Sequence, residues 1–184
     1  MPNDEKRLLD LTRQIQKGNL DAFDELYELT KKTVYFTALS IVHDQSLAQD
    51  VMQDTYGDFL KKIASFKGSE TVSAYLARAA HNKAINLVTK RDKEVLLDAY
   101  DNEDMYGAEE KEEDEGGTIF KLAKECLSAD EYQVTIMHAV NEMKFRQIAQ
   151  ALNKPIGTVL WLYNKAMKTL KEKLGGEEND EEDK

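Results

Sequence analysis

The sequence contains little cysteine and little proline, and both shortages narrow the possible structures. Cys126 is the only cysteine among 184 residues, so a disulfide framework and a multi-cysteine zinc site are excluded, and the chain suits a reducing compartment. The two prolines are Pro2 and Pro155, and glycine is also sparse. Because proline and glycine are the residues that interrupt helices, we expect an all-α protein.

Long apolar runs are missing as well. No stretch approaches the roughly 18 apolar residues that a membrane-spanning helix requires. The N-terminal segment MPNDEKRLLDLT is charged and has no hydrophobic core of the kind found in signal peptides. The sequence therefore predicts a soluble, cytoplasmic protein without a membrane partner.

Signals for metal binding or catalysis are equally scarce. The three histidines and the cysteine lie on different segments, without the spacing of metal ligands. The chain has no glycine-rich phosphate loop and no nucleophile motif, and its many paired carboxylates lie in a linker or on exposed helix faces. We therefore expect a protein that is not an enzyme and that needs no metal and no cofactor.

Negative charge dominates the chain but is unevenly distributed. The formal net charge is −10, yet residues 57–93 carry 8 basic and 3 acidic side chains, and residues 118–174 carry 9 and 5. Residues 94–117 carry 1 basic and 11 acidic side chains, and residues 175–184 carry 1 and 6. The acidic segments either maintain solubility or set apart two basic blocks that are free to bind nucleic acid.

The same segmentation predicts two domains. Residues 100–117, YDNEDMYGAEEKEEDEGG, are dense in charge, lack apolar periodicity and end in a glycine pair, which is typical of a flexible linker. We expect two small helical domains joined by an acidic flexible linker. Their predicted bounds are residues 1–95 for the first domain, 96–120 for the linker, 121–174 for the second domain and 175–184 for an acidic disordered tail.

Apolar spacing predicts several helices in the first domain. Leu8, Leu11 and Ile15 share one helical face, and the segment HDQSLAQDVMQDTYGDFLKKI predicts a later helix with Asp44 or Ser46 as its N-cap. The outward side of that later helix consists of Gln49, Asp50, Gln53, Asp54 and Asp58. This acidic-amide surface is either an ordinary solvated face or a docking site.

The segment AYLARAAHNKAINLVTKRDK predicts a further helix with alanine and leucine on its inner side and basic residues on its outer side. A basic face of this kind can follow a phosphate backbone. In the second domain, the segment FRQIAQALNKPIGTVLWLYNKA predicts a helix-turn-helix. Asn153 and Lys154 form its turn, and Pro155 suits the first turn of its second helix.

The second helix of this motif is unexpectedly apolar. A helix that reads DNA is expected to offer Lys, Arg, Ser or Asn, whereas this one offers Leu160, Trp161 and Leu162. Helical geometry predicts an inward face made of Val159, Tyr163, Ala166, Leu170 and Leu174. Leu160 and Leu162 then border this face on opposite sides, and Trp161 points away from it, toward solvent or a partner.

Four segments in the same order resemble the extracytoplasmic-function sigma factors, the smallest class of bacterial RNA polymerase specificity subunits. They are GNLDAFDELY (18–27), DQSLAQDVMQDTYGDFLKKI (44–63), AYLARAAHNKAINLV (74–88) and FRQIAQALNKPIGTV (145–159). The resemblance covers residues 15–93 and 125–174. It implies a protein that binds core RNA polymerase and directs promoter recognition and DNA opening for transcription initiation.

The resemblance also implies roles for particular residues. In this family the DVMQDTY-type helix binds the clamp helices of the largest catalytic polymerase subunit. The positions that receive this role are Asp50, Gln53, Asp54 and Asp58. The loop that follows captures a base flipped out of the −10 element, and the next helix lies against promoter DNA. The positions that receive the −10 role are Phe66, Lys67, Ser69, Tyr75, Arg78, Asn82 and Lys83.

The same likeness assigns the acidic linker to the template-strand and RNA-exit path of the polymerase, where negative charge mimics nucleic acid. In the helix-turn-helix, the residues available to bind DNA are Lys154, Thr158, Asn164, Lys165 and Lys168. The family pattern is not fully kept, because Ala77 replaces one ring of an aromatic pair and His81 replaces an arginine. After Val159, where the family shows Lys/Arg-Ser-Arg, the chain has Leu160, Trp161 and Leu162.

These departures predict weak reading of the −35 element and a protein partner for the surface of Leu160, Trp161 and Leu162. The partner is the polymerase flap, an anti-sigma factor or a DNA-bound recruiter, including an RNA-guided one. In the alternative interpretation, Trp161 contacts thymine methyl groups or packs on the linker. Two other functions stay open at this point: a helix-turn-helix DNA-binding regulator, and a sigma-like adaptor or decoy that binds partners without initiating transcription.

Overall fold

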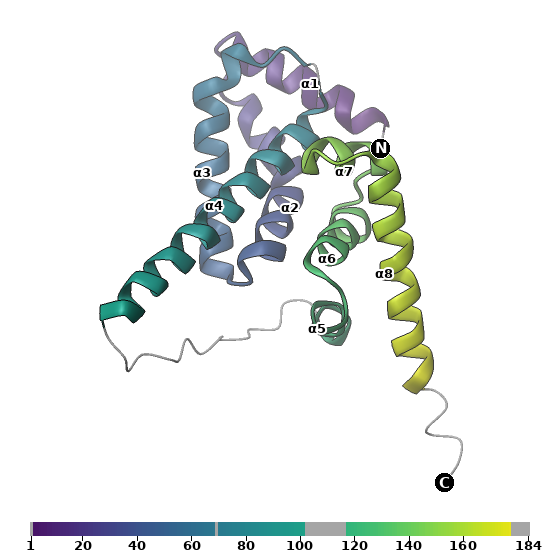
Figure 1. The fold of residues 1–184 in the computed structure, drawn as a ribbon. Helices are drawn as coiled ribbons and strands as arrows, with labels where there is room; N and C mark the ends of the chain where they lie inside the picture. Colours follow the sequence, from purple (N-terminus) through teal and green to yellow (C-terminus); the bar gives the residue numbers. More distant parts are fainter. Residues whose placement is uncertain (1, 69, 102–116, 178–184) are drawn as a thin grey trace.

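The structure, a computed structural model, describes residues 2–68, 70–101 and 117–177, and within these ranges it is helical and contains no strand (Figure 1). The all-α prediction is confirmed. The elements are α1 (Pro2–Gln16), α2 (Ala22–Val42), α3 (Gln45–Lys62), the 3-10 turn η1 (Ile63–Ser65), α4 (Val72–Asp101), α5 (Gly117–Cys126), α6 (Ala129–Thr135), the π turn η2 (Ile136–Val140), α7 (Phe145–Leu152) and α8 (Ile156–Glu177). No helix in these ranges is long and apolar enough to cross a membrane.

Helices α1 to α4 form the first half of the molecule, with α2 packed against the other three. The predicted face of α1 is buried, and its leucines and Ile15 join a core that includes Leu26 and Val34 of α2, Phe59 of α3 and Leu76 of α4. Burial of side chains of this size contributes on the order of 2 kcal/mol each. This core fixes the spacing of α2, α3 and α4, on which the surfaces described below depend.

The local signals between α2 and α3 act as the sequence predicts. His43 ends α2 in the left-handed conformation with a φ of 53°, and its N–H donates to the carbonyl of Leu39. Asp44 is the N-cap of α3, because its Oδ1 accepts a hydrogen bond of 2.8 Å from the N–H of Leu47. These two residues set the sharp turn that places α3 beside α2.

Helices α5 to α8 form the second half, and α6 packs against α8 in it. Ser128 and Glu131 form a capping box at the start of α6. Asn153 ends α7 with a φ of 51°, and the carbonyl of Pro155 accepts from the N–H groups of Thr158 and Val159 at the start of α8. The predicted helix-turn-helix, with its turn at Asn153 and Lys154, is confirmed.

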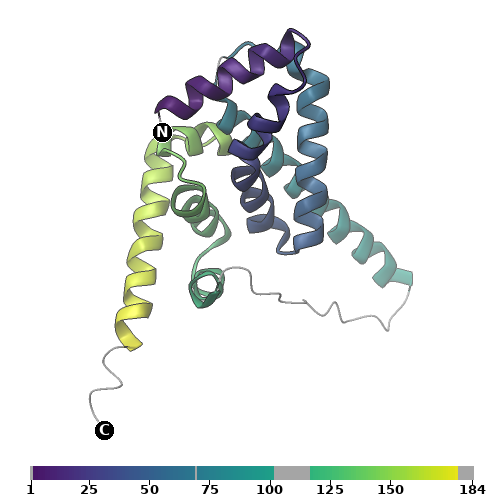
Figure 2. The same ribbon diagram turned by 180° about the vertical axis from the view of Figure 1, so that it is seen from behind.

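The two halves pack against each other, with α4 beside α7 and α2 beside α6 and η2 (Figures 1 and 2). Ala77 of α4 is fully buried in the core of the second half, where it lies with Val134, Met137 and Ile148. Asn141, which follows η2, donates from Nδ2 to the carbonyl of Thr33 and to Thr37 Oγ1, both at 3.3 Å. Helix α4 therefore contributes side chains to the cores of both halves.

A polar cluster joins three helices at the same boundary. The Glu5 carboxylate of α1 accepts hydrogen bonds from the N–H of Val72 at 3.1 Å, from Ser73 Oγ and from Gln147 Nε2 at 2.8 Å. The Gln147 side chain also accepts from the N–H of Lys144 at the start of α7. One carboxylate thus connects α1, the first turn of α4 and the scaffold helix of the helix-turn-helix.

Helix α4 continues to Asp101 and α5 begins at Gly117, so both helices reach into the segment predicted as the linker, residues 96–120. The segment EVLLDAYD carries enough apolar residues to extend the α4 pattern beyond the expected boundary at residue 95. The rest of the linker, residues 102–116, and most of the acidic tail lie outside the described residues. The proposed domain bounds remain a prediction.

Candidate functional surfaces

The exposed side of α3 carries the acidic-amide residues predicted to bind polymerase. Asp50, Gln53 and Asp54 are exposed, whereas Val51 and Tyr56 face the core. We call Asp50, Gln53 and Asp54 the α3 acidic face. Their spacing places them on one side of the helix, where a partner can reach all three together.

Asp58 lies on the same helix but in a different environment. Its Oδ2 lies 2.8 Å from Lys83 Nζ of α4, and its Oδ1 lies 3.7 Å from Lys61 Nζ. The hydrogen bond from Lys83 lowers the pKa of Asp58. Asp58 and Lys83, to which the family resemblance assigns polymerase and DNA roles, therefore form an ion pair with each other in this structure.

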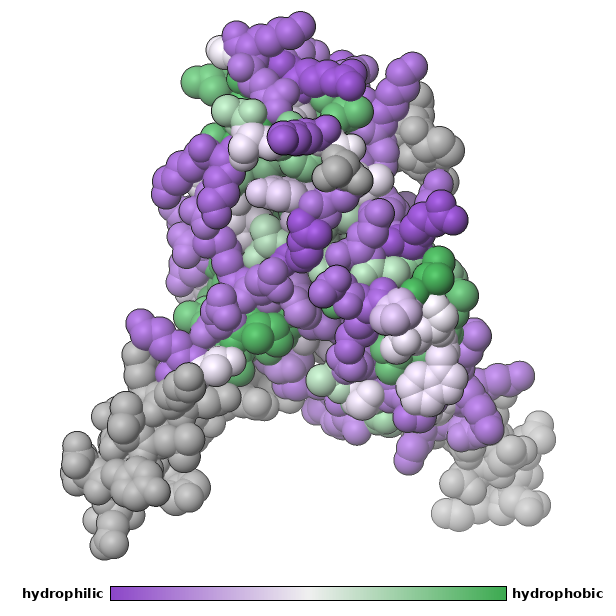
Figure 3. Space-filling view, turned by 45° about the horizontal axis from the view of Figure 1, so that its top comes forward, coloured by the Kyte–Doolittle hydropathy of each residue, from purple (hydrophilic) through white to green (hydrophobic). Residues whose placement is uncertain are grey.

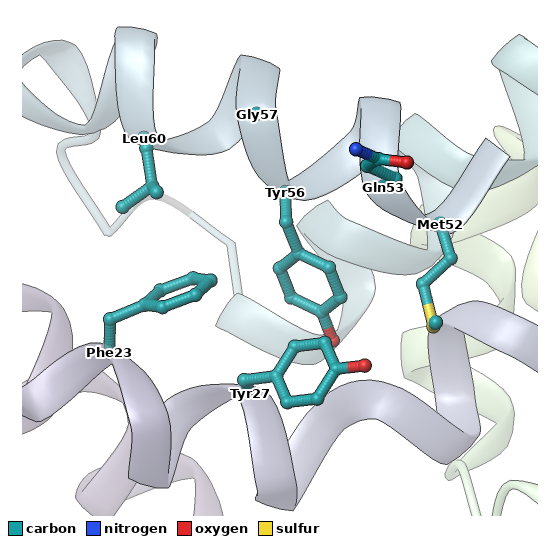
Figure 4. Close-up of a pocket in the computed structure, with 7 residues that line it drawn as sticks. All are labelled: Phe23, Tyr27, Met52, Gln53, Tyr56, Gly57 and Leu60. Atoms are coloured by element: carbon teal, nitrogen blue, oxygen red, sulfur yellow. The ribbon is translucent and has the colours of Figure 1, made fainter. Parts of the chain in front are cut away.

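A surface pocket opens between α2 and α3 next to the α3 acidic face (Figure 4). Its volume is about 310 Å³, and Gln53 belongs both to its lining and to the α3 acidic face. The lining residues are Phe23, Tyr27, Met52, Gln53, Tyr56, Gly57 and Leu60. This pocket was not predicted from the sequence, where its only signal is Gly57, a glycine in the middle of a predicted helix.

Three of the residues predicted to bind the −10 element come together where α3, η1 and α4 meet. The rings of Phe66 and Tyr75 lie edge to face with their centroids 5.2 Å apart, and both pack on Phe59 of the core. The guanidinium carbon of Arg78 lies 5.9 Å from the centroid of the Tyr75 ring, and this side chain forms an ion pair with Glu70. We call Phe66, Tyr75 and Arg78 the ring cluster.

The other residues predicted for the −10 element surround the ring cluster less closely. Lys67 is exposed in the loop after η1, where Gly68 has a φ of 69° that favours glycine. Asn82 is exposed on α4, with its Oδ1 3.3 Å from His81 Nδ1. Ser69 lies outside the described residues.

Three of the five predicted DNA-binding residues of the helix-turn-helix form ion pairs within their own half, two of them with carboxylates of α6. Lys154 Nζ lies 2.8 Å from Asp130 Oδ2, and Lys165 Nζ lies 2.7 Å from Glu131 Oε1. The hydrogen bonds from Lys165, followed by those from Ser128, hold the pKa of Glu131 below its ordinary value. Lys154 and Lys165 are therefore not free for phosphate groups here, whereas exposed Thr158 and Asn164 have no such carboxylate partner in the described residues.

Lys168, the fifth predicted DNA-binding residue, is exposed, with its Nζ 3.9 Å from Glu172 Oε1 one turn further along α8. Both side chains are mostly in solvent, so a pair of this kind contributes at most about 1 kcal/mol. Lys168 can therefore exchange Glu172 for a phosphate group at little cost.

The apolar part of α8 is exposed at Ile156, Leu160 and Trp161, which are 45%, 38% and 59% exposed. We call these three residues the α8 apolar patch. On the face of the molecule shown in Figure 3, hydrophilic side chains dominate, and apolar and intermediate ones gather on the right, on the side where α8 lies in Figure 1. Lys165 Nζ lies 5.3 Å from the centroid of the Trp161 ring.

The predicted surface of Leu160, Trp161 and Leu162 is wrong for one member. Leu162 is 6% exposed and packs in the core of the second half with Met137 and Ile148. Its positions relative to Val159 and Ala166 are i+3 and i−4, so all three share the buried face of α8. Leu174, predicted to face inward, is 44% exposed because α8 extends beyond the helices that cover its first turns.

Comparison with known proteins places this geometry in a family. A model of the sigma-70 region 2 family matches residues 26–94, which span most of α2, all of α3 and most of α4. The ECF RNA polymerase sigma factor SigW of Bacillus subtilis is 24% identical over 175 residues, which cover 88% of this chain and 94% of SigW. The RNA polymerase sigma-H factor of Pseudomonas aeruginosa is 24% identical over 165 residues, which cover 81% of this chain and 84% of that protein.

Solved structures agree with the sequence relatives. The sigma factor RpoE in a complex with the anti-sigma factor NepR from Bartonella quintana matches with a TM-score of 0.66 and 25% identity, over 85% of this chain and 98% of RpoE. CnrH in a complex with the cytosolic domain of CnrY shares the fold, with a TM-score of 0.64 and 20% identity over 90% of this chain and 96% of CnrH. The chain belongs to the extracytoplasmic-function sigma factors, and it is a sigma factor for transcription initiation.

The buried carboxylate at the start of α6 predicts a pH dependence. Glu131→Gln should lower the free energy of unfolding by about 1 kcal/mol at pH 7, because the ion pair with Lys165 is lost. The folded-state pKa of Glu131 lies below its unfolded value of about 4.3. Its contribution is therefore complete above that value and is lost as the pH falls through the folded-state pKa.

Urea unfolding of the wild type and of Glu131→Gln, compared at pH 7 and at successively lower pH, measures this effect. The difference between the two proteins should shrink below about pH 4. A difference that stays constant down to pH 3 would contradict the assignment of the carboxylate as the titrating group.

Proposed function

We propose that this sigma factor binds core RNA polymerase through the α3 acidic face. The observation that carries this proposal is the contrast between Asp58 and its neighbours on α3. Asp58 is already paired with Lys83, whereas neither Asp50 nor Asp54 forms a salt bridge within the part of the chain that the structure describes. Carboxylates without partners can meet a basic helix of the polymerase without first breaking an existing pair.

The ring cluster and Lys67 are proposed to bind promoter DNA at the −10 element. The cluster offers aromatic faces on which a flipped base can stack, and Arg78 offers a cation beside them. In the free chain Arg78 is held by Glu70, whose side chain is only 14% exposed. A DNA phosphate would have to compete with this carboxylate, so binding to the polymerase is proposed to come first and to supply the local concentration of DNA.

The packing of the two halves is proposed to represent a closed state of the free protein. Helix α7 lies on α4 at Ala77, one residue from Arg78 of the ring cluster. DNA that reaches the ring cluster along α4 would meet the helix-turn-helix half. Binding to polymerase and promoter is therefore proposed to separate the halves, with the acidic segment between α4 and α5 acting as the tether.

The helix-turn-helix is proposed to read the −35 element weakly. Lys154 and Lys165 are paired with Asp130 and Glu131, and each lost phosphate contact weakens the sequence-independent part of DNA binding. The α8 apolar patch is proposed to bind a protein instead: the polymerase flap, an anti-sigma factor or a DNA-bound recruiter. RpoE and CnrH are structurally similar proteins that were solved with such protein partners, NepR and CnrY.

The comparisons do not favour the two alternative functions, a helix-turn-helix regulator and an adaptor without initiation activity. Sigma factors are generally not enzymes, and we propose the same for this chain. A cytoplasmic location is proposed on the same basis, since transcription takes place there in bacteria.

If the α3 acidic face binds core RNA polymerase, removing its charges should weaken that binding. Asp50→Ala/Asp54→Ala should bind core RNA polymerase at least tenfold more weakly and should lose run-off transcription in proportion, because two contacts to a basic surface disappear. Fluorescence anisotropy of the full chain labelled at Cys126 measures the affinity. The stability should stay within about 0.5 kcal/mol, because both residues are exposed.

The matched control is Asp10→Ala/Glu125→Ala, which removes the same charge from exposed positions on α1 and α5. This control should bind core polymerase like the wild type. Equal weakening of both double variants would attribute the effect to net charge and would contradict a specific face on α3.

If the α8 apolar patch binds a protein partner, Trp161→Ala should have a phenotype distinct from that of the α3 variants. The variant should fold and bind core polymerase normally, because the side chain is 59% exposed, but its recruitment to promoter DNA in cells should fall severalfold. Chromatin immunoprecipitation and quantitative copurification measure this effect. Leu174→Ala, an exposed apolar residue of the same helix outside the patch, is the control.

Full recruitment of Trp161→Ala to promoters and to every copurifying partner would rule out the patch as a binding surface. Equal loss with Leu174→Ala would point to a general effect on α8. Neither result would affect the proposed role of the α3 acidic face.

A further inference from the structure

Gly57 occupies a position at which nothing within the described residues requires glycine. It lies inside α3, and its φ is not among the positive values found in the described chain. A Cβ atom built on it meets nothing within 4 Å apart from its chain neighbours and the backbone of α3 itself. Glycine inside a helix is less favourable than alanine, so Gly57 lowers the stability of α3 without a gain in backbone freedom or internal packing.

Gly57 borders the pocket between α2 and α3, and the other lining residues explain what the pocket can hold. Phe23, Met52 and Leu60 provide apolar walls, and the rings of Tyr27 and Tyr56 lie between them (Figure 4). The Tyr56 hydroxyl is hydrogen-bonded to Thr30 Oγ1 at 2.8 Å, and burial raises the pKa of Tyr56. Its polar atom is therefore satisfied inside the bundle, and the pocket offers mainly carbon atoms to a visitor.

Acidic residues border the pocket on both α2 and α3, and the exposed Lys61 follows Leu60 on α3. Gln53 lines the pocket and belongs to the α3 acidic face, so Asp50 and Asp54 lie within one turn of it. On the other side, Asp24 is exposed and follows Phe23 directly on α2. An apolar cavity bordered by acidic residues matches an amphipathic helix that carries one apolar anchor flanked by lysine or arginine.

We propose that a basic helix of the core polymerase inserts a side chain of the size of leucine or methionine into this pocket. A lysine or arginine one turn away on that helix meets Asp50 or Asp54. The absent side chain of Gly57 lets the backbone of the partner helix approach α3 closely. This inference rests on the proposed function, since it assumes that the α3 acidic face binds polymerase, and it adds the apolar anchor that fixes the register of the contact.

Gly57→Met tests the proposal by filling the pocket from within. The full chain carrying this change, labelled at Cys126, should bind purified core RNA polymerase at least tenfold more weakly than the wild type. Its melting temperature should be equal or higher, because the helix loses a glycine. Ala64→Met, which adds the same side chain at an exposed position just beyond α3, should leave the affinity unchanged.

A second pair of variants removes the pocket wall instead of filling it. Leu60→Ala should weaken binding to core polymerase about threefold to tenfold. Leu29→Ala, which truncates an exposed leucine of α2 outside the pocket lining, should have no effect. The two pairs together separate occupancy of the pocket from general changes in surface hydrophobicity.

The Asp50→Ala/Asp54→Ala variant, measured in parallel, separates failure of this proposal from failure of the proposed function. If it binds weakly while Gly57→Met and Leu60→Ala bind like the wild type, the pocket proposal is overturned and the polymerase role of the α3 acidic face stands. If the wild type itself does not bind core polymerase, the proposed function fails, and the pocket proposal fails with it.

Discussion

Helix α4 packs into the cores of both halves of the molecule, and this is the constraint on which the rest of the structure depends. Leu76, Ala80 and Ala84 face the core of the first half, while Ala77 faces the core of the second. Small side chains allow two groups of helices to approach one helix closely, and packing on two sides fixes the rotation of α4 about its axis. The Glu5 carboxylate reinforces this arrangement by connecting α1, the start of α4 and Gln147 of α7.

The same constraint divides the functional surfaces into two groups. The α3 acidic face is exposed and the pocket beside it opens between α2 and α3, so the packing of the second half on α4 and α2 leaves both uncovered. The ring cluster lies beside the α4–α7 contact, and Lys154 and Lys165 of the helix-turn-helix are paired with carboxylates of α6. This division supports the proposed order, in which the chain meets the polymerase before it meets DNA.

Most of the fold follows from the sequence because its signals are local. Capping by Asp44 and Ser128, the turn at Asn153 and the face of α1 are set by residues within one or two turns. The features that were not predicted from the sequence depend on contacts between helices. Leu162 is buried because α6 and η2 cover a wide side of α8, and Lys154 and Lys165 pair with carboxylates that are distant in the sequence. Predicting the pocket at Gly57 would have required the relative positions of α2 and α3, which no local sequence pattern specifies.

The most direct test is the distance between the halves with and without polymerase. Cysteines at Gln49 of α3 and Lys171 of α8, both exposed, would carry spin labels in a Cys126→Ser background. Double electron–electron resonance should give one narrow distribution of spin-label distances, centred at a short distance, for the free chain. The distances should be longer once core polymerase and promoter DNA are bound. An unchanged short distance in the complex that initiates transcription would contradict a closed state that opens on binding.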